Sequence, residues 1–415
     1  MRVDADMEVL YERCCGFDIH KNSVVACALI SEAKKEIKTF GTMTADLLEL
    51  CVWLKEKEIQ MVAMESTASY WKPIFNLLEL EGIPAILVNA QHIKAVPGKK
   101  TDMKDAEWIA KLLRHGLLKA SFIQPREDRE TKELVRYRSS IVEERAREFN
   151  RIDKVLQGAN IKLSSVASRM DTKSGMDIIR SIAAGEVSPE ILAQMAQGTM
   201  KSKEEALAKA LTGLIQPHQQ MILRSMIDHI DSITQQIEKL DEEIARRLNP
   251  KKDIIEALDE IVGIGERTAQ VIISEIGSDM SKFPSAENLA SWAGLSPGQN
   301  ESAGKRKRGK TRKGNGTLKK TLVQSARSAA RSKNTYFNSF YSRLAARRGA
   351  NRAAVALARK ILEICYYMIK DGTSFNDLGG DYFLKLNTKR ILNSSIKRIE
   401  SLGFTVQIEP QDIAV

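Results

Sequence analysis

A short polar run, residues 101–105 (TDMKD), most constrains what this chain can fold into. It follows the apolar segment 85–88 and a loop broken by proline and glycine, and beyond it apolar residues recur at three- and four-residue spacing, which predicts a helix. Asp102 is expected near the N-cap of that helix, with Asp105 one turn later on the same face. Taken alone, the pair favours helix capping; the rest of the chain reverses that interpretation.

The segment before this helix is predicted to form three strands, then a helix, a strand, a helix and a strand. The predicted ranges are, in order, 15–19, 24–30, 35–42, 46–57, 60–64, 70–80 and 84–88. Asp18 lies in the first strand, and Glu65 directly follows the fourth. This order resembles the ribonuclease-H-type fold, also called RuvC-like. In that fold, acids from the first strand, the fourth strand and a later helix meet at one edge.

Four acids therefore form a predicted metal site: Asp18, Glu65, Asp102 and Asp105. Clustered carboxylates repel one another unless cations neutralise them. Oxygen-rich sites of this kind suit Mg²⁺ or Mn²⁺, and two such ions can clamp the attacking and leaving oxygens of a phosphodiester. Three histidines are interpreted as surface or DNA-facing residues in place of metal ligands: His20, His92 and His115.

Positive charge is concentrated in one stretch of the 415-residue chain. The formal net charge is +11, yet residues 302–362 hold eighteen Lys or Arg and no acid, so the other residues sum to −7 (11 − 18). Such a basic excess is the electrostatic footprint of a polyanion partner. The basic residues predicted to bind nucleic acid are Lys305, Arg306, Lys307, Arg308, Lys310, Arg312, Lys313, Lys319 and Lys320.

Other features favour a soluble cytoplasmic protein. No apolar run reaches the ~20 residues of a membrane span, and the N-terminus is acidic, unlike a signal peptide. The five cysteines are odd in number and lack C-x-x-C spacing, so we interpret them as reduced, mostly buried thiols without a zinc site or disulfide framework.

The middle of the chain carries two long helical patterns. Apolar residues recur at sevens across 131–160, and across 219–248 they alternate in three- and four-residue steps. This pattern predicts a coiled coil, with an ordinary helix bundle as the alternative. The two helices are expected to pair either within a chain or between subunits. Residues 161–218 have weak periodicity and are interpreted as an inserted helical subdomain.

Residues 258–273 resemble a helix–hairpin–helix, in which the turn around Gly263 and Gly265 exposes backbone N–H groups to a phosphate. An ordinary helix turn explains the two glycines about as well. Residues 304–311 match the phosphate-loop pattern G-x-x-x-x-G-K-[ST], but no buried strand precedes them and four consecutive cations in the loop would repel one another. We therefore reject nucleotide hydrolysis.

Ser302 lies among glycines and cations, which makes it a plausible nucleophile toward a phosphodiester. Serine needs activation by a base or a metal, and nearby cations can stabilise charge on the transferring phosphoryl group. No histidine is close in sequence, so the activator must come from elsewhere in the fold or from another subunit. Ser274 and Ser296 are weaker candidates.

These motifs together resemble the DEDD-type insertion-sequence transposases of the IS-one-ten and IS-eleven-eleven type, which act as bridge-RNA-guided recombinases. The resemblance spans most of 12–372, including Gly314-Asn315-Gly316 and the run 347–351 (RRGAN). It implies a RuvC-like domain at 12–125, a coiled-coil spacer at 126–250 with the insert 161–218, and a helical transposase domain at 251–372 with the hairpin motif and the serine. A C-terminal tail of unknown role follows at 373–415.

The resemblance also implies a function. In this family the four acids bind Mg²⁺, and the serine, here Ser302, forms a covalent phosphoserine with DNA. The two sites are composite between subunits of a tetramer, and a structured guide RNA pairs with donor and target DNA. The host would be bacterial and the protein nucleoid-associated. Ala303 departs from the glycine expected after the serine.

Two other interpretations remain open. One is a metal-dependent structure-specific endonuclease resembling a Holliday-junction resolvase, without serine chemistry. The other is a non-catalytic nucleic-acid-binding protein that uses the hairpin motif and the basic segment. Loss or retention of activity in Ser302→Ala and Asp102→Asn variants discriminates among the three.

Overall fold

The computed structural model describes residues 8–66, 68–89, 102–298, 301–302, 305–306, 311, 313–386 and 388–407. For residues 102–104, 301–302, 305–306 and 389–391 the description covers the backbone alone. The chain divides into two compact units, Met1–Arg126 and Glu127–Val415. No helix in the described part of the chain is long and apolar enough to cross a membrane.

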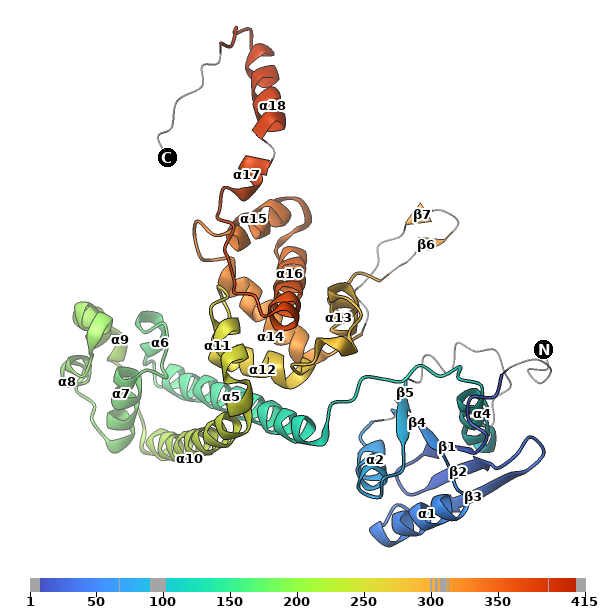
Figure 1. Ribbon diagram of the computed structural model, residues 1–415. Helices are drawn as coiled ribbons and strands as arrows, with labels where there is room; N and C mark the ends of the chain where they lie inside the picture. The colour runs from blue at the N-terminus through green and yellow to red at the C-terminus, as the bar shows by residue number, and fades with distance from the viewer. Residues whose placement is uncertain are drawn as a thin grey trace. The chain divides into compact units, whose positions relative to one another are not determined.

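The first unit is built on a five-stranded mixed sheet with the strand order β3-β2-β1-β4-β5 (Figure 1). The first three strands form an antiparallel meander, whereas β4 runs parallel to β1 and β5 runs parallel to β4. The parallel strands are joined through helices, as a crossover connection requires. The strands are β1 (Cys14–Ile19), β2 (Val24–Leu29), β3 (Lys35–Phe40), β4 (Met61–Glu65) and β5 (Ala85–Val88).

Helices cover both faces of this sheet. Helices α1 (Thr44–Glu56) and α2 (Trp71–Leu80) pack on one face, where Phe17 and Met64 belong to the larger apolar core. Helix α4 (Asp102–Arg114) packs on the other face, in a second cluster with Cys14 and Ala63. These elements lie within a few residues of the ranges predicted from the sequence, because each carries its own apolar periodicity.

Gly16 lets α4 lie directly on the sheet. A Cβ atom at this position would lie 2.3 Å from the carbonyl oxygen of Ala106 and 2.4 Å from the amide nitrogen of Ala110. No side chain larger than hydrogen fits between strand and helix at that point. The glycine therefore sets how closely α4 approaches β1.

The second unit is helical and begins with a long antiparallel pair, α5 (Arg126–Gly158) and α10 (Pro217–Leu248). The two helices pair within the chain: Ile141 packs with Ile233 and Ile237, and Arg247 and Glu130 form an ion pair at 3.1 Å nearer the other end. The residues at 161–218 fold into short helices over the far end of the pair and share one apolar core with it. These are α6 (Leu163–Val166), α7 (Lys173–Ala184), α8 (Pro189–Gln194), the 3₁₀ helix η1 (Gly198–Lys203) and α9 (Glu204–Leu211).

Four helices pack around α16 (Ala350–Asp371): α11 (Lys252–Asp259), α13 (Ala286–Trp292), α14 (Gly316–Ala329) and α15 (Tyr336–Arg348). The inner face of α16 is apolar from Ala353 to Cys365. The hydroxyl of Tyr366 on this helix donates to the carbonyl oxygen of Phe283 at 2.9 Å. Between α13 and α14, β6 (Glu301–Ser302) pairs with β7 (Lys305–Arg306). The other elements are η2 (Asn249–Lys251), α12 (Glu266–Ile276), η3 (Met280–Lys282), α17 (Tyr382–Leu386) and α18 (Thr388–Glu400).

Candidate active site

Strand alternation directs two predicted acids to the same face of the sheet. Phe17 and Met64 point into the core under α1 and α2, so their neighbours Asp18 and Glu65 point to the face covered by α4. Asp18 is the next-to-last residue of β1 and Glu65 is the last residue of β4, and these strands are parallel neighbours. Both carboxylates therefore lie at the same end of adjacent strands.

Helix α4 brings a third carboxylate to this point. Asp105 lies in its first turn and is half-buried. Burial raises the pKa of Asp18 above its ordinary value, and although His20 lowers that pKa, the nearby charges of Asp105 and Glu65 raise it further. Three acids far apart in sequence thus interact electrostatically in the fold. The side chain of Asp102, the fourth acid of the prediction, lies outside the described residues.

His20 also contacts this cluster. Its Nε2 atom lies 3.2 Å from Oδ2 of Asp18, and its side chain is 55 % exposed. A histidine at this position can hold the carboxylate in place and still face a ligand in solvent. The sequence interpretation of His20 as a surface residue is consistent with this exposure, but the contact with Asp18 was not anticipated.

The donor set suits a hard divalent cation. It consists of carboxylate oxygens, which Mg²⁺ and Mn²⁺ prefer. Burial raises the pKa of Asp18, the neighbouring acids raise it further, and a bound cation would offset the negative charge of the cluster. Among the described side chains, no three His, Cys, Asp or Glu converge closely enough to hold a metal ion as they stand. The acids therefore have the chemistry of metal ligands, but their described side chains do not form a closed metal site.

The cysteines do not compete for this role. All five are buried and unpaired, as the sequence predicts. Burial raises the pKa of Cys14 and Cys365 to about 12 and that of Cys27 and Cys51 to about 11, so these thiols stay protonated.

In the second unit, Ser302 lies in a β-hairpin. Its backbone pairs with Lys305, and Glu301 pairs with Arg306. A further bridge joins Pro297 to Thr311 at the foot of the hairpin. The side chains of Ser302, Lys305 and Arg306 lie outside the described residues, as do Ala303, Lys307, Arg308, Lys310 and Arg312 in full.

The segments before and after this hairpin pack directly against each other and form a clamp at its base. A Cβ atom on Gly314 would lie 2.4 Å from the amide nitrogen of Gly294 and 2.6 Å from the carbonyl oxygen of Trp292, so the two backbones touch. Asn315 donates its backbone N–H to the same Trp292 oxygen at 3.3 Å. Its side-chain oxygen accepts from the amide of Leu318 at 3.1 Å, which caps α14.

Glu275 ties this clamp to two other helices. Its side chain is 1 % exposed and accepts two hydrogen bonds from Arg136 of α5, at 2.6 and 2.8 Å. The same carboxylate accepts a hydrogen bond from the side-chain amide of Asn315 at 2.6 Å. One buried acid on α12 therefore joins the long helix pair to the cap of α14. Glu275 was not predicted from the sequence, where the available signal is an acid next to the apolar residues 271–273 and 276.

The two hairpin-motif glycines have different roles. Gly263 has a φ of +86°, and its Cβ would lie 2.7 Å from backbone atoms of Ser325 and Ala329, so packing against α14 explains it without a ligand. Gly265 is the exposed N-cap of α12. Ser274, a weaker nucleophile candidate, is buried in α12 and its hydroxyl donates to the carbonyl oxygen of Val271 at 3.0 Å.

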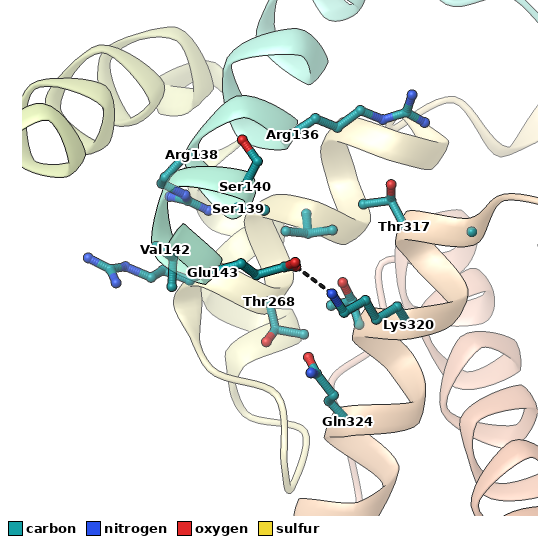
Figure 2. Close-up of a pocket in the computed structure, with 14 residues that line it drawn as sticks. Arg136, Arg138, Ser139, Ser140, Val142, Glu143, Thr268, Thr317, Lys320 and Gln324 are labelled. Carbon is teal, nitrogen blue, oxygen red and sulfur yellow. Dashed lines mark hydrogen bonds and ion pairs between the residues drawn. The ribbon is translucent and has the colours of Figure 1, made fainter. Parts of the chain in front are cut away.

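A cavity of about 540 Å³, lined mostly by polar and charged residues, lies between α5, α12 and α14 (Figure 2). Lys320 of α14 forms an ion pair across it with Glu143 of α5. Lys319 instead donates to the hydroxyl of Thr311 at 2.8 Å, next to the hairpin foot, and Lys313 is exposed. Of the three described side chains in the predicted basic set, two are thus engaged within the protein.

Comparison with known families decides what this arrangement belongs to. Residues 15–161 match a transposase family model of the DEDD, IS110 type, and residues 255–342 match the transposase IS116/IS110/IS902 family. The two matches together cover more than half of the chain and contain every acid and serine discussed above. The chain belongs to the IS110-type transposases. The resemblance drawn from the motifs is confirmed.

Individual relatives agree with this family. The transposase for insertion sequence element IS1111A of Coxiella burnetii is 26% identical over 363 residues, which are 85% of this chain and 88% of that protein. Two further relatives match over shorter stretches. An IS110 uncharacterized 43.6 kDa protein of Streptomyces coelicolor is 33% identical over 118 residues (27% and 28% of the two chains), and a putative transposase of Sinorhizobium fredii is 29% identical over 150 residues (35% and 38%).

The buried carboxylate of this IS110-type transposase makes a stability prediction. Glu275→Ala leaves Arg136 and Asn315 without their partner, and we expect it to destabilise the second unit by about 2–3 kcal/mol, because hydrogen bonds to a charged acceptor are lost while Arg136, which is 47 % exposed, keeps access to water. Urea unfolding measures the loss, and hydrogen exchange of the Leu318 amide reports loss of the α14 cap. Glu143→Gln is the matched control, because it removes an exposed acid paired to Lys320 and costs at most about 1 kcal/mol. Equal effects of the two substitutions would contradict the clamp.

Proposed function

We propose that this transposase is an RNA-guided DNA recombinase that cuts and rejoins donor and target DNA through a covalent phosphoserine at Ser302. The observation that carries the proposal is the placement of Asp18 near the end of β1, Glu65 at the end of the parallel neighbour β4 and Asp105 in the first turn of α4. Its metal ligands are the four acids of the predicted cluster: Asp18, Glu65, Asp102 and Asp105.

The first unit is assigned a RuvC-like fold. Support comes from its mixed sheet, in which an antiparallel meander is followed by two parallel strands, and from the placement of acids on β1, β4 and α4. When bound there, a divalent cation such as Mg²⁺ or Mn²⁺ would stabilise charge on the transferring phosphoryl group. The protein's own contribution is to hold the carboxylates at one end of the sheet through the close packing of α4 on Gly16.

The serine step exchanges one phosphodiester for another. Oγ of Ser302 bonds to phosphorus while the bond from phosphorus to one DNA oxygen breaks, and the serine proton ends on that departing oxygen as a hydroxyl. In the second step, a hydroxyl of the partner DNA attacks the phosphorus of the phosphoserine, and the bond between phosphorus and Oγ of Ser302 breaks. No external energy source is needed because the number of ester bonds is unchanged. The cations of 305–313 are assigned to the phosphates, where they offset negative charge.

The partners of the reaction are assigned from the family. A structured guide RNA would pair with donor and target DNA. The protein would bind the sugar–phosphate backbones of the nucleic acids through Gly265, Lys313 and the basic hairpin residues. The carboxylates lie in the first unit of the chain and the serine lies in the second. In the proposed homotetramer, the acids of one subunit would face the serine of another, so that each active site combines residues of two subunits.

The test begins with the RNA. The transposase is purified after expression with its native flanking locus, and the RNA that accompanies it is sequenced. We expect one defined RNA of discrete length, which then predicts the DNA sites for an assay that traps a covalent protein–DNA adduct in Mg²⁺. Heterogeneous RNA or none contradicts the guided mechanism. Cleavage of branched DNA without an adduct would instead identify a resolvase-like endonuclease.

A further inference from the structure

An apolar groove of about 1100 Å³ opens at the foot of the serine hairpin. Pro297 and Thr311, which bridge to each other at that foot, line one end of it. Its two long walls are α15 and α16, which are neighbours in the helical core of the second unit (Figure 1). Neither the carboxylate cluster nor the serine chemistry accounts for this groove.

One wall is aromatic and rigidly held. Tyr336 and Phe340 of α15 face the groove. The ring of Tyr336 stacks on Phe383 with centroids 5.4 Å apart and planes 22° apart, and it meets the edge of Tyr382 at 5.3 Å. Rings fixed in this way present a flat apolar surface at low entropic cost to a ligand. The opposite wall carries the small side chains of α16, among them Val355.

The rim of the groove is positively charged. Arg352, Arg359 and Lys360 of α16 all line it. Glu363 is shared by two of these cations, at 2.8 Å from Arg359 and 3.6 Å from Lys360, so the set keeps a net positive charge. Arg352 is exposed and makes no ion pair or side-chain hydrogen bond with any described residue. It is available to an anion.

This combination matches one ligand chemistry. A flat apolar wall binds the face of a nucleobase, and a cation at its rim binds the attached phosphate. The volume is in the range of small-molecule sites and holds a nucleotide. An apolar peptide would leave the cations unused, and an acidic peptide would leave the aromatic wall unused.

The position of the groove favours DNA as the source of the nucleotide. Ser302 is five residues from Pro297, so it lies at most about 18 Å from the groove even along a fully extended chain. That span corresponds to a few nucleotides of an extended strand. DNA that is opened for pairing with a guide has unpaired bases at such a distance from the reacting phosphate.

We propose that this groove binds an unpaired DNA base close to the phosphate attacked by Ser302, with the base between Phe340 and Val355 and its phosphate on Arg352. The proposal rests on the proposed function, since it places the groove beside the reacting strand. The groove adds a contact specific for single-stranded DNA to a protein surface that is otherwise suited to the sugar–phosphate backbone of nucleic acid.

The test measures binding without chemistry. The full chain with Ser302→Ala is titrated against a fluorescein-labelled 15-mer of deoxythymidine and against a duplex of equal length, followed by fluorescence anisotropy. Arg352→Ala removes the rim cation, and Val355→Trp fills the groove. The matched control is Arg331→Ala, which removes another exposed cation of the acid-free segment that does not line the groove.

We expect both groove variants to weaken single-strand binding about tenfold and duplex binding less than about twofold, whereas Arg331→Ala changes both equally. 5-Iododeoxyuridine in the oligonucleotide should crosslink to Phe340 or Tyr336 in the parent protein. Equal effects of Arg352→Ala and Arg331→Ala, or no effect of Val355→Trp, would overturn the proposal. Weaker binding of a uridine 15-mer but not of the DNA would assign the groove to RNA.

The assay separates this proposal from the proposed function. It needs no guide RNA, metal or strand cleavage, so a negative result leaves the covalent-adduct experiment untouched. Conversely, failure to find an adduct leaves the single-strand contact measurable. Thermal unfolding of each variant checks that the fold is kept. Because Arg352 is exposed, we expect Arg352→Ala to fold like the parent protein.

Discussion

Replacing Ser302 with alanine should abolish strand exchange. If its Oγ atom is the nucleophile, the variant loses the covalent step and the rate falls by roughly 10⁴-fold or more, as for other enzymes that lose a covalent nucleophile. Binding of DNA and RNA should remain within about twofold, because one hydroxyl contributes little to an interface built on cations. The measurement is a gel assay for recombined DNA, together with denaturing electrophoresis for protein joined to labelled DNA.

Ser296 provides the control for this experiment. It lies before the same hairpin and is half-buried, so Ser296→Ala tests whether any serine near the hairpin foot is required. We expect its rate to stay within about threefold of the parent. If Ser302→Ala still cuts DNA at the normal rate, the serine mechanism is wrong and the metal-dependent endonuclease becomes the better description.

If Asp105 is a metal ligand as proposed, Asp105→Asn should remove most cleavage activity by weakening the proposed metal site. Loss of one charged ligand costs several kcal/mol of charge stabilisation, which corresponds to about 10³-fold in rate. Binding of Mn²⁺ to the full chain, measured by calorimetry, should weaken at least about tenfold. Excess chelator should reproduce the loss of activity in the parent protein, and added Mg²⁺ should restore it.

Glu107 is the matched control on the same helix. It lies two residues after Asp105, but Lys35 and Lys111 bind its carboxylate at 2.8 and 3.0 Å. Glu107→Gln therefore removes an acid of α4 without touching the cluster, and both metal binding and cleavage should stay near the parent values. Equal losses in the two variants would show that α4 needs its charge for folding and that Asp105 is no ligand.

Much of the first unit follows from local sequence. Apolar periodicity predicted its strands and helices, and the position of each acid at a strand end or helix start predicted which carboxylates would meet. Asp18 and Glu65 lie on one face because strand side chains alternate with a period of two. The acid-free segment 302–362 predicts a polyanion partner whatever fold it adopts, because net charge is a property of composition.

The second unit was less accessible to such reasoning. Four apolar residues stand at heptad spacing across 131–160, and Val135 and Leu156 among them are buried, as the pattern predicts. Val142 and Phe149 are only partly buried, and Ile141 and Ile152 are the buried residues near them. The pattern therefore identified the long helix and part of its inner face. The spacing left open whether α5 and α10 pair within the chain or between subunits, and the tertiary structure packs them against each other within the chain.

The sequence by itself determined the basic segment and most of the element types, and it pointed to the family and predicted acids at one end of the sheet. Only the tertiary structure decided that α4 presses on Gly16, that Glu275 holds Arg136 and Asn315 together, and that a groove forms between α15 and α16. Arg136 and Glu275 are 139 residues apart, and no local pattern encodes their meeting. Periodicity reflects the few residues of one helix or strand, whereas a buried ion pair depends on how whole elements pack against one another.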